Sequence, residues 1–280
     1  MLFTISFLEM LSENFCVSII IRTRNIESRF VELLRRLSGQ TLRPYELVVV
    51  DNFSSKVELE KMSALLLLVK RDFFSNLVEV KLVPIVDGEF SYPYSANVGS
   101  AVAEGDLVCV TNGHSLPCSD TWLENGIVHF NDPTVAGVGG YFTPYKSGTF
   151  WEKAAYNSWN WLNKLSKAYA KDTFFSTTNC VFRRSLWEKY PFDESLPHDI
   201  PSAGKFGGED YDWSVEMLAR GYNIVVEPKF NVYHCHNETP AQLIPKYLIW
   251  RRIRMRVNSF VRPRRSFTRL EKSEPLYYDI

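Results

Sequence analysis

Short continuous runs of apolar residues alternate with amphipathic segments along the first half of the chain. The runs at 17–21 and 46–50 (VSIII and ELVVV) are bounded by polar residues, a pattern typical of strands buried on both faces of a parallel sheet. Between them, apolar residues recur at helical spacing over 30–37, and Gly39 stands where a helix C-cap is expected. This segment is therefore predicted to form a βαβ unit.

The same alternation continues toward the middle of the chain. The pattern predicts helices near 58–69 and 97–103, and strands at 78–83 and 106–111. Strands alternating with helices indicate an α/β fold with a layered sheet. The second half is less regular, and there we expect helices over 119–130 and 209–220 and strands at 135–141, 177–182, 223–227 and 231–234.

Composition and charge narrow the class of protein. The chain has 280 residues, of which 45% are hydrophobic and 23% charged, which excludes disordered and collagen-like proteins. Its 32 basic residues balance 32 acidic ones, so no nucleic-acid partner is expected. An odd number of widely spread cysteines indicates reduced thiols and a cytoplasmic location; they are Cys16, Cys109, Cys118, Cys180 and Cys235.

The two ends of the chain differ in character. Residues 1–15 lack the basic start of a signal peptide and carry Glu9 within the apolar stretch, so we interpret them as an N-terminal extension. The strongest apolar run, 64–69, is too short to span a bilayer. The segment 246–269 is basic and interleaved with aromatic residues. It is consistent with a solvated tail, a nucleic-acid arm or a helix on an anionic membrane surface, and the aromatic residues favour the membrane.

Polar side chains follow three of the predicted strands. They lie at 22–25, 51–55 and 112–117, directly after buried apolar runs. In an open α/β sheet, ligands bind outside the carboxyl ends of the parallel strands. We therefore expect these three segments to meet at one binding site.

Four stretches, in this order and spacing, resemble the family 2 glycosyltransferases: VSIIIRTRN, SGQTLRPYELVVVDNFSS, SANVGSAVAEGDLVCVTN and GGEDYDWSVEMLARGYNIVVEPKFNVYHCH. The resemblance implies the GT-A fold, a mainly parallel, Rossmann-like sheet flanked by helices. It implies a nucleotide-sugar-binding half at 16–117, a less regular acceptor-binding and catalytic half at 118–240, and a basic C-terminal helical segment at 241–280. It further implies transfer of a sugar from a nucleotide sugar, with inversion, to a hydroxyl of a saccharide or lipid-linked saccharide.

The resemblance assigns the donor to the strand ends. Asp51 and Asn52 are expected at the nucleotide base, and Arg22 and Thr23 at ribose or phosphate. Asn52 replaces the usual second acidic residue, but its amide can still recognise a base, and a UDP-sugar is the expected donor. An Asx turn is the structural alternative for Asp51 and Asn52. The expected donor-binding residues are Arg22, Thr23, Asp51, Asn52, Asn97, Asn112 and His114.

Asn112-Gly113-His114 stands where the family writes Asp-x-Asp to hold a divalent cation. Because both carboxylates are missing, we expect weak binding of Mn²⁺ or Mg²⁺, with His114 and His234 as the candidate ligands and His234 preferred over His236. A zinc site is not expected, because neighbouring residues of a strand point to opposite faces. Arg22 or a protonated His114 is an alternative source of positive charge, and a cap on the following turn is the structural alternative for His114.

Two acidic residues follow the glycine pair at 207–208, in the first turn of a predicted helix. The helix dipole favours carboxylates at this position by about 0.3–1 kcal/mol, so capping explains part of the pattern. The family resemblance assigns Asp210 as the base that deprotonates the acceptor hydroxyl and gives Glu209 a role in positioning the acceptor. Asp212 and Glu216 are expected to face elsewhere or to solvate the helix.

Two further functions were considered beside sugar transfer. A non-catalytic nucleotide-sugar-binding relative, with a regulatory or scaffolding role, would explain the altered Asp-x-Asp position. A nucleotidyltransferase is disfavoured, because 22–36 contains no glycine for the loop that such an enzyme needs.

An acceptor sugar could stack on aromatic side chains, although packing is the commoner role for Trp151, Tyr156, Trp159 and Trp161. A peripheral location at the inner face of the membrane would suit a lipid-linked acceptor.

Overall fold

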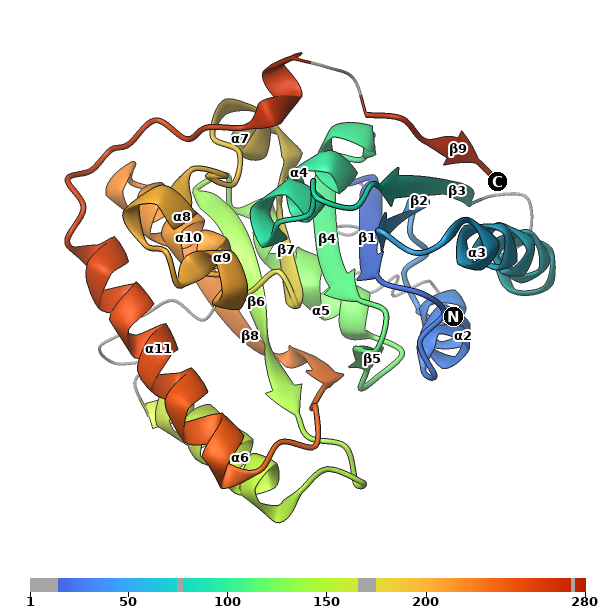
Figure 1. The fold of residues 1–280 in the computed structure, drawn as a ribbon. Coiled ribbons are helices and arrows are strands. Elements are labelled where there is room, and N and C mark those ends of the chain that lie inside the picture. The colour runs from blue at the N-terminus through green and yellow to red at the C-terminus, as the bar shows by residue number, and fades with distance from the viewer. Residues whose placement is uncertain (1–14, 75–77, 166–174, 273–274) are drawn as a thin grey trace, which may run out of the picture.

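The structure is a computed structural model that describes residues 15–74, 78–165, 175–272 and 275–280 (Figure 1). Most of the predicted N-terminal extension therefore lies outside the described residues. In the described part of the chain, nine strands form one sheet in the order β5-β8-β6-β7-β4-β1-β2-β3-β9. They are β1 (Val17–Thr23), β2 (Glu46–Asn52), β3 (Glu79–Ile85), β4 (Leu107–Asn112), β5 (Leu116–Pro117), β6 (Val135–Thr143), β7 (Asn179–Arg183), β8 (Asn223–Tyr233) and β9 (Tyr278–Asp279). The predicted α/β layered sheet is confirmed.

Helices cover both faces of this sheet (Figure 1). They are α2 (Phe30–Ser38), α3 (Lys56–Val69), α4 (Tyr92–Val102), α5 (Trp122–Ile127), α6 (Phe150–Leu165), α7 (Arg184–Lys189), α8 (Leu196–Asp199), α9 (Ala203–Phe206), α10 (Glu209–Ala219) and α11 (Pro240–Asn258). A π-helical segment follows α3 at Lys70–Phe74, and 3₁₀ turns lie at Val128–Asn131 and Arg269–Lys272. No helix within the described ranges is long and apolar enough to cross a bilayer.

Strand β1 lies in the middle of the parallel part of the sheet, between β2 and β4. Its side chains alternate between two cores. Ile19 and Ile21 pack in the core that contains Leu33 of α2, whereas Ile20 packs in the opposite core with Val98 of α4. Burying such a side chain completely stabilises a fold by about 1.5–3 kcal/mol, so the continuous apolar run is explained by helices on both faces.

Strand β8 is one continuous element, which corrects the prediction of two strands at 223–227 and 231–234. It pairs in parallel with β6, and the register shifts between Gly140 and Phe142. Pro228 lies opposite this irregularity, where a residue without an N–H group costs no ladder hydrogen bond. Strands β6 and β8 approach so closely there that a Cβ on Gly140 would lie 1.5 Å from the carbonyl oxygen of Phe230.

The C-terminal strap, residues 259–272 and 275–280, follows α11 across the fold and ends in β9, which pairs antiparallel with β3 (Figure 1). Arg262 contacts Asp212 at 2.5 Å and Glu216 at 2.6 Å, and all three side chains are at most 9% exposed. Of the two predicted alternatives, solvation of α10 is wrong: Asp212 and Glu216 face the strap and hold it against the helix. Two arginines further along the strap are also ion-paired to the core: Arg264 with Asp193 and Asp199, and Arg269 with Glu194.

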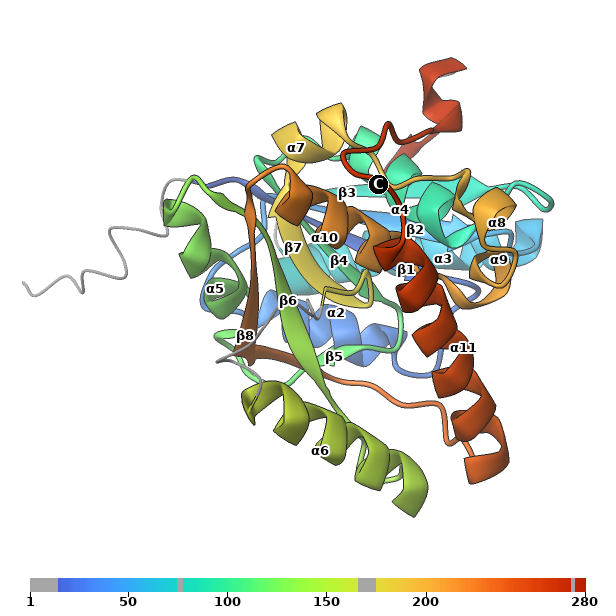
Figure 2. The ribbon, with the colours of Figure 1, turned by 90° about the vertical axis from the view of Figure 1, so that its left-hand side faces the viewer.

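These ion pairs change the interpretation of the predicted basic segment 246–269. Arg262, Arg264 and Arg269 are committed to acidic partners of the fold, so they do not present free charge to a membrane. The exposed arginines that remain in this segment lie mainly on α11. Figure 1 shows α6 and α11 on the side of the molecule away from α3, and Figure 2, in which that side faces the viewer, shows both helices in the lower part of the molecule. The guanidinium of Arg254 in α11 lies 5.0 Å from the ring centre of Trp159 in α6.

Candidate active site

The register of the parallel strands brings four of the predicted donor residues to one edge of the sheet. Thr23 at the end of β1 is paired with Asp51 of β2, and Arg22 is paired with Asn112 of β4. The expectation that these strand ends meet is therefore confirmed.

Asp51 shapes the loop that follows β2. Its carboxylate accepts hydrogen bonds from the Ser54 N–H at 2.9 Å and from the Ser54 hydroxyl at 2.5 Å. The Ser54 hydroxyl oxygen in turn accepts a bond from the Asn25 N–H, which ties this loop to the one after β1. The neighbouring Asn52 has a buried amide oxygen without a hydrogen-bond partner among the described residues. The Asp51 carboxylate thus stabilises the turn after β2, whereas the amide oxygen of Asn52 remains available as a hydrogen-bond acceptor.

Asn97 does not belong to this edge and is corrected to a structural residue. It is fully buried in α4, where its amide oxygen accepts bonds from the Trp187 indole and the Phe192 N–H, and its amide nitrogen donates to the Phe192 carbonyl and to Glu194. All of its polar capacity is used inside the fold. Asn97 was predicted to bind the donor because it lies in a stretch that resembles the family. Such a resemblance does not distinguish residues that pack inside the fold from residues that bind a ligand.

Arg22 connects the strand ends to the second half of the chain. Its guanidinium is 7% exposed and donates to the carbonyl and hydroxyl oxygens of Thr177, both at 2.9 Å, and to the Asn112 amide oxygen at 3.4 Å. The Thr177 hydroxyl lies 3.2 Å from a carboxylate oxygen of Glu209. Thr177 was missed by the sequence analysis, because a threonine at the start of a strand carries no distinctive chemical signature.

The glycine pair before α10 turns the chain so that two carboxylates enter the site. Gly207 and Gly208 have φ values of 75° and 129°, which favour glycine. Glu209 is 2% exposed, and burial, followed by the charge of Asp210, raises its pKa to about 7 against the opposing effect of Arg22. Asp210 is only partly buried, and its oxygens accept bonds from the N–H groups of Thr177 and Tyr211. The accessible carboxylate of the pair is therefore Asp210.

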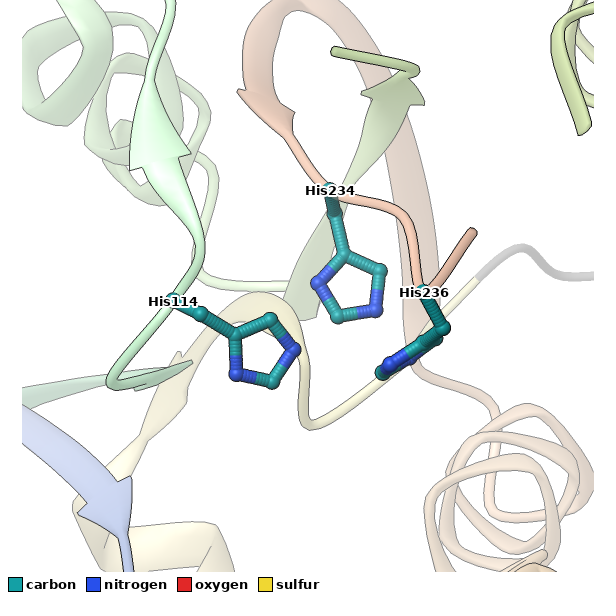
Figure 3. Close-up of side chains that lie close together, drawn as sticks. All are labelled: His114, His234 and His236. Atoms are coloured by element: carbon teal, nitrogen blue, oxygen red, sulfur yellow. The ribbon is translucent and has the colours of Figure 1, made fainter. Parts of the chain in front are cut away.

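Three histidines gather beside the turn that follows β4 (Figure 3). His114 comes from this turn, and His234 and His236 come from the segment that follows β8. The candidate ligand atoms of the three residues all lie within 4.8 Å of one another. His236 was passed over in the sequence analysis. Neighbouring residues of an extended chain point to opposite sides, which keeps Cys235 out of a site formed by His234 and His236. The two histidines themselves are alternate residues, so their side chains lie on the same side.

The chemistry of the three rings suits a transition-metal ion. Burial and the neighbouring imidazoles lower the pKa values of His234 and His236, so both rings are neutral, as metal ligands must be. Nδ1 of His234 lies 3.0 Å from the Ser115 hydroxyl, and with the proton assigned to Nδ1 the other nitrogen is free to bind an ion. Both ring nitrogens of His114 are buried without an aligned hydrogen bond in the described chain, and only Nδ1 has a close partner, a Glu27 carboxylate oxygen at 2.6 Å. The remaining nitrogen, Nε2, fits a divalent cation.

A polar cleft of about 270 Å³ opens next to the histidines. Its lining includes Glu27 and Arg29 from the loop after β1, together with His114, Tyr145 and His236. The guanidinium of Arg29 lies 3.6 Å from the ring centre of Tyr145, and the Tyr145 hydroxyl donates to the His114 carbonyl. The cleft thus gives a bound molecule access to the histidine cluster.

Comparison with solved structures agrees with the architecture. The mannosyltransferase PcManGT from Pyrobaculum calidifontis, in complex with GDP-Man and Mn²⁺, has a TM-score of 0.60 at 21% identity, over 80% of this chain and 57% of its own. Glucosyl-3-phosphoglycerate synthase from Mycobacterium tuberculosis, in complex with Mg²⁺ and UDP, has a TM-score of 0.56 at 14% identity, over 92% and 85%. The present chain thus spans just over half the length of the mannosyltransferase. These similarities confirm the predicted GT-A fold.

Two curated relatives and a family model match the sequence. The O-antigen chain rhamnosyltransferase RfbN of Salmonella typhimurium is 24% identical over 243 residues, covering 82% of this chain and 70% of the relative. The rhamnosyltransferase WbaN of Salmonella anatum is 25% identical over 230 residues, covering 79% and 66%. The model described as Glycosyl transferase family 2 matches residues 18–191, which is more than half of the sequence. The chain therefore belongs to glycosyl transferase family 2.

Proposed function

We propose that this protein transfers a sugar from a nucleotide sugar to a hydroxyl of a saccharide acceptor, with inversion at the anomeric carbon. The observation that carries the proposal is the position of Asp210. Its accessible carboxylate lies at the N-terminus of α10, bonded to the Thr177 N–H, and Thr177 in turn binds Arg22 at the end of β1. A base is thus tied to the edge of the sheet where the donor strands end.

The reaction proposed is a single displacement. Asp210 accepts the proton of the acceptor hydroxyl as a general base. The hydroxyl oxygen forms a bond to the anomeric carbon while the bond to the diphosphate oxygen breaks on the opposite face. The buried Glu209, bonded to Thr177 and to the Gly208 N–H, positions the acceptor beside the base.

The donor is proposed to lie along the ends of β1, β2 and β4. The unpartnered amide oxygen of Asn52 can accept a bond from the base, with Thr23, Arg22 and Asn112 toward ribose and diphosphate. A UDP-sugar remains the proposed donor class. The names of the two O-antigen chain rhamnosyltransferases add rhamnose as a candidate sugar and an O-antigen chain as a candidate acceptor. The non-catalytic alternative gains no support from the comparisons.

We further propose that His114, His234 and His236 hold a divalent cation. Such an ion, when bound, stabilises the negative charge that develops on the leaving diphosphate. Weak binding was predicted from the loss of both carboxylates of Asp-x-Asp, with His114 and His234 as candidate ligands, and the position of His236 supports a third ligand. Three imidazoles favour Mn²⁺ and other transition metals over Mg²⁺, which prefers oxygen ligands.

The surface of α11 supports a proposed contact with an anionic membrane. Three apolar side chains lie along its outer face and are 48–63% exposed, namely Ile244, Leu248 and Met255. Arg251, Arg252 and Arg256 are exposed beside them, with no ion pair recorded in the described ranges. A helix with apolar and cationic groups on one exposed side suits an anionic lipid interface. We propose a peripheral location at the cytoplasmic face of the membrane.

The proposed function is tested with a panel of nucleotide sugars that carry uracil, guanine or thymine, rhamnose donors included. Binding to the folded chain raises the unfolding temperature, so each compound is screened by thermal shift with and without Mn²⁺. The expected result is stabilisation by one class of donor, increased by Mn²⁺, together with sugar transfer or slow donor hydrolysis. Stabilisation without any turnover would favour the non-catalytic alternative, and no stabilisation by any donor would contradict both.

A further inference from the structure

A carboxylate that the sequence analysis did not consider lies against the histidine cluster. Oε2 of Glu27 is 2.6 Å from Nδ1 of His114, and the two side chains are 29% and 24% exposed. The other carboxylate oxygen, Oε1, accepts a hydrogen bond from the Thr23 hydroxyl at 3.1 Å. Glu27 is therefore held from one side by β1 and faces the imidazole on the other.

The local fold places Glu27 there by a close approach of two loops. The loop after β1 turns at Asn25, whose φ is 60°, and the N–H of Gly113 donates to the Arg22 carbonyl. A Cβ on Gly113 would lie 2.6 Å from the Thr23 hydroxyl oxygen and 2.9 Å from Oε1 of Glu27. Only glycine lets the turn that carries His114 come this close to Glu27.

The hydrogen bonding of His114 is incomplete as it stands. Both of its ring nitrogens are buried and have no aligned hydrogen-bond partner among the described residues, even though Nδ1 is near Glu27. Rotation of the ring can align Nδ1–H with the carboxylate, which would leave the lone pair of Nε2 for another partner. His234 already has such an outer partner in the Ser115 hydroxyl. A metal-bound histidine commonly donates its second ring N–H to an outer carboxylate, carbonyl or water.

We propose that Glu27 is a positioning residue that orients His114 for metal binding and supplies a negative charge that Asn112-Gly113-His114 lacks. It acts through the imidazole, whose Nε2 it directs toward His234 and His236. The inference rests on the proposed three-histidine metal site. In this arrangement a chain without Asp-x-Asp at the end of β4 still has one carboxylate next to the ion. That carboxylate, Glu27, comes from the loop after β1.

The test measures Mn²⁺ binding to the full chain, independently of activity. Mn²⁺ is titrated into wild type, Glu27→Gln and Glu60→Gln, and free Mn²⁺ is followed by its EPR signal, which also detects weak binding. Glu60 is an exposed residue of α3, so its variant matches the change in charge away from the site. We expect Glu27→Gln to lower the affinity for Mn²⁺ by roughly 10–100-fold and Glu60→Gln to leave it unchanged. The unfolding temperatures without metal should agree, which shows that the loss is not a folding defect.

A second arm asks whether Glu27 acts through His114. In the His114→Ala background, adding Glu27→Gln should produce little further loss, because the partner that Glu27 orients is gone. A full additional loss would overturn the positioning role and make Glu27 a direct ligand. Wild-type affinity in Glu27→Gln, with Mn²⁺ still bound, would overturn the inference alone. Failure of wild type to bind Mn²⁺ would overturn the three-histidine site and this inference with it, while leaving the role of Asp210 to be judged by turnover.

Discussion

At the scale of single residues, burial gives the two carboxylates of the acid pair different environments. Glu209 is enclosed with Thr177 and the Gly208 N–H, and its pKa is raised to about 7, whereas Asp210 keeps contact with solvent. A base must be reachable by the acceptor hydroxyl and ionised before it reacts. The exposed member of the pair meets the first requirement.

The raised pKa of Glu209 predicts a pH-dependent stability. The ordinary pKa is 4.5, so between about pH 4.5 and 7 the folded state retains a proton that the unfolded state has lost. Stability from this group is therefore complete below about pH 4.5 and is lost as the pH rises through 7. Glu209→Gln cannot ionise, so its unfolding temperature should rise relative to wild type between pH 5 and 8, whereas that of Glu60→Gln should not. A constant difference between Glu209→Gln and wild type across this range would contradict the buried, protonated carboxyl.

The sequence predicted some site residues better than others. Arg22 and Asn112 could be predicted because strand ends of a parallel sheet converge, whatever the details of packing. Thr177 and Glu27 could not, because their roles arise only when distant segments fold together. His236 could have been predicted from its spacing of two residues from His234 in an extended chain.

At the scale of elements, α11 has apolar residues on two sides. Leu243, Ile253 and Val257 are buried against the fold, and Ile253 lies close to Gly208, the residue that precedes the acid pair. The opposite side exposes the apolar residues and arginines proposed to meet lipid. A membrane contact through α11 would therefore lie near the start of α10, where Asp210 lies, which suits a lipid-linked acceptor.

Liposome co-sedimentation checks the role of α11. The triple variant Arg251→Gln, Arg252→Gln, Arg256→Gln should lose most binding to anionic vesicles, because each cation contributes about 1 kcal/mol near such a surface. A matched variant neutralises Arg43, Lys56 and Lys189, which are exposed elsewhere, and should bind nearly as wild type does. Binding of wild type should weaken at high salt. Equal sedimentation of the two triple variants would argue against α11 as the contact.

Element boundaries depended on signals of unequal strength. The β-branched runs predicted the starts of β1 and β2 correctly, because a strand buried on both faces gives a continuous apolar run in the sequence. Helix α4 begins at Tyr92 rather than at 97, since Ser91 caps it and Pro93 occupies its first turn. The loose pattern around Pro228 concealed a continuous strand that only pairing with β6 explains.

At the scale of the whole molecule, the C-terminal strap closes the fold over α10. Its ion pairs were not predictable, because Arg262 and its partners Asp212 and Glu216 are about fifty residues apart in the sequence. The sequence showed a run of basic residues but not which of them would find acids in the core. The strap thus links the stability of α10 to a segment about fifty residues further along the chain.

Removal of Arg262 should therefore be costly. Arg262→Ala leaves two buried carboxylates without their main cation, and breaking such a network typically costs about 3–5 kcal/mol. The free energy of unfolding from urea titration should fall by this amount, while Arg265→Ala, at an exposed neighbour, should change it by no more than about 0.5 kcal/mol. A loss below about 1 kcal/mol for Arg262→Ala would show that the strap contributes little to the fold.

The central claim, that Asp210 is the base of a sugar transfer, is tested most directly by the rate of Asp210→Asn on the donor that the thermal-shift panel identifies. Asparagine keeps the size of the side chain but cannot accept the proton. The account predicts that turnover falls by roughly 10²–10⁴-fold while donor-induced stabilisation is retained, and that Asp87→Asn at an exposed loop has wild-type activity. Turnover by Asp210→Asn close to that of wild type would contradict it.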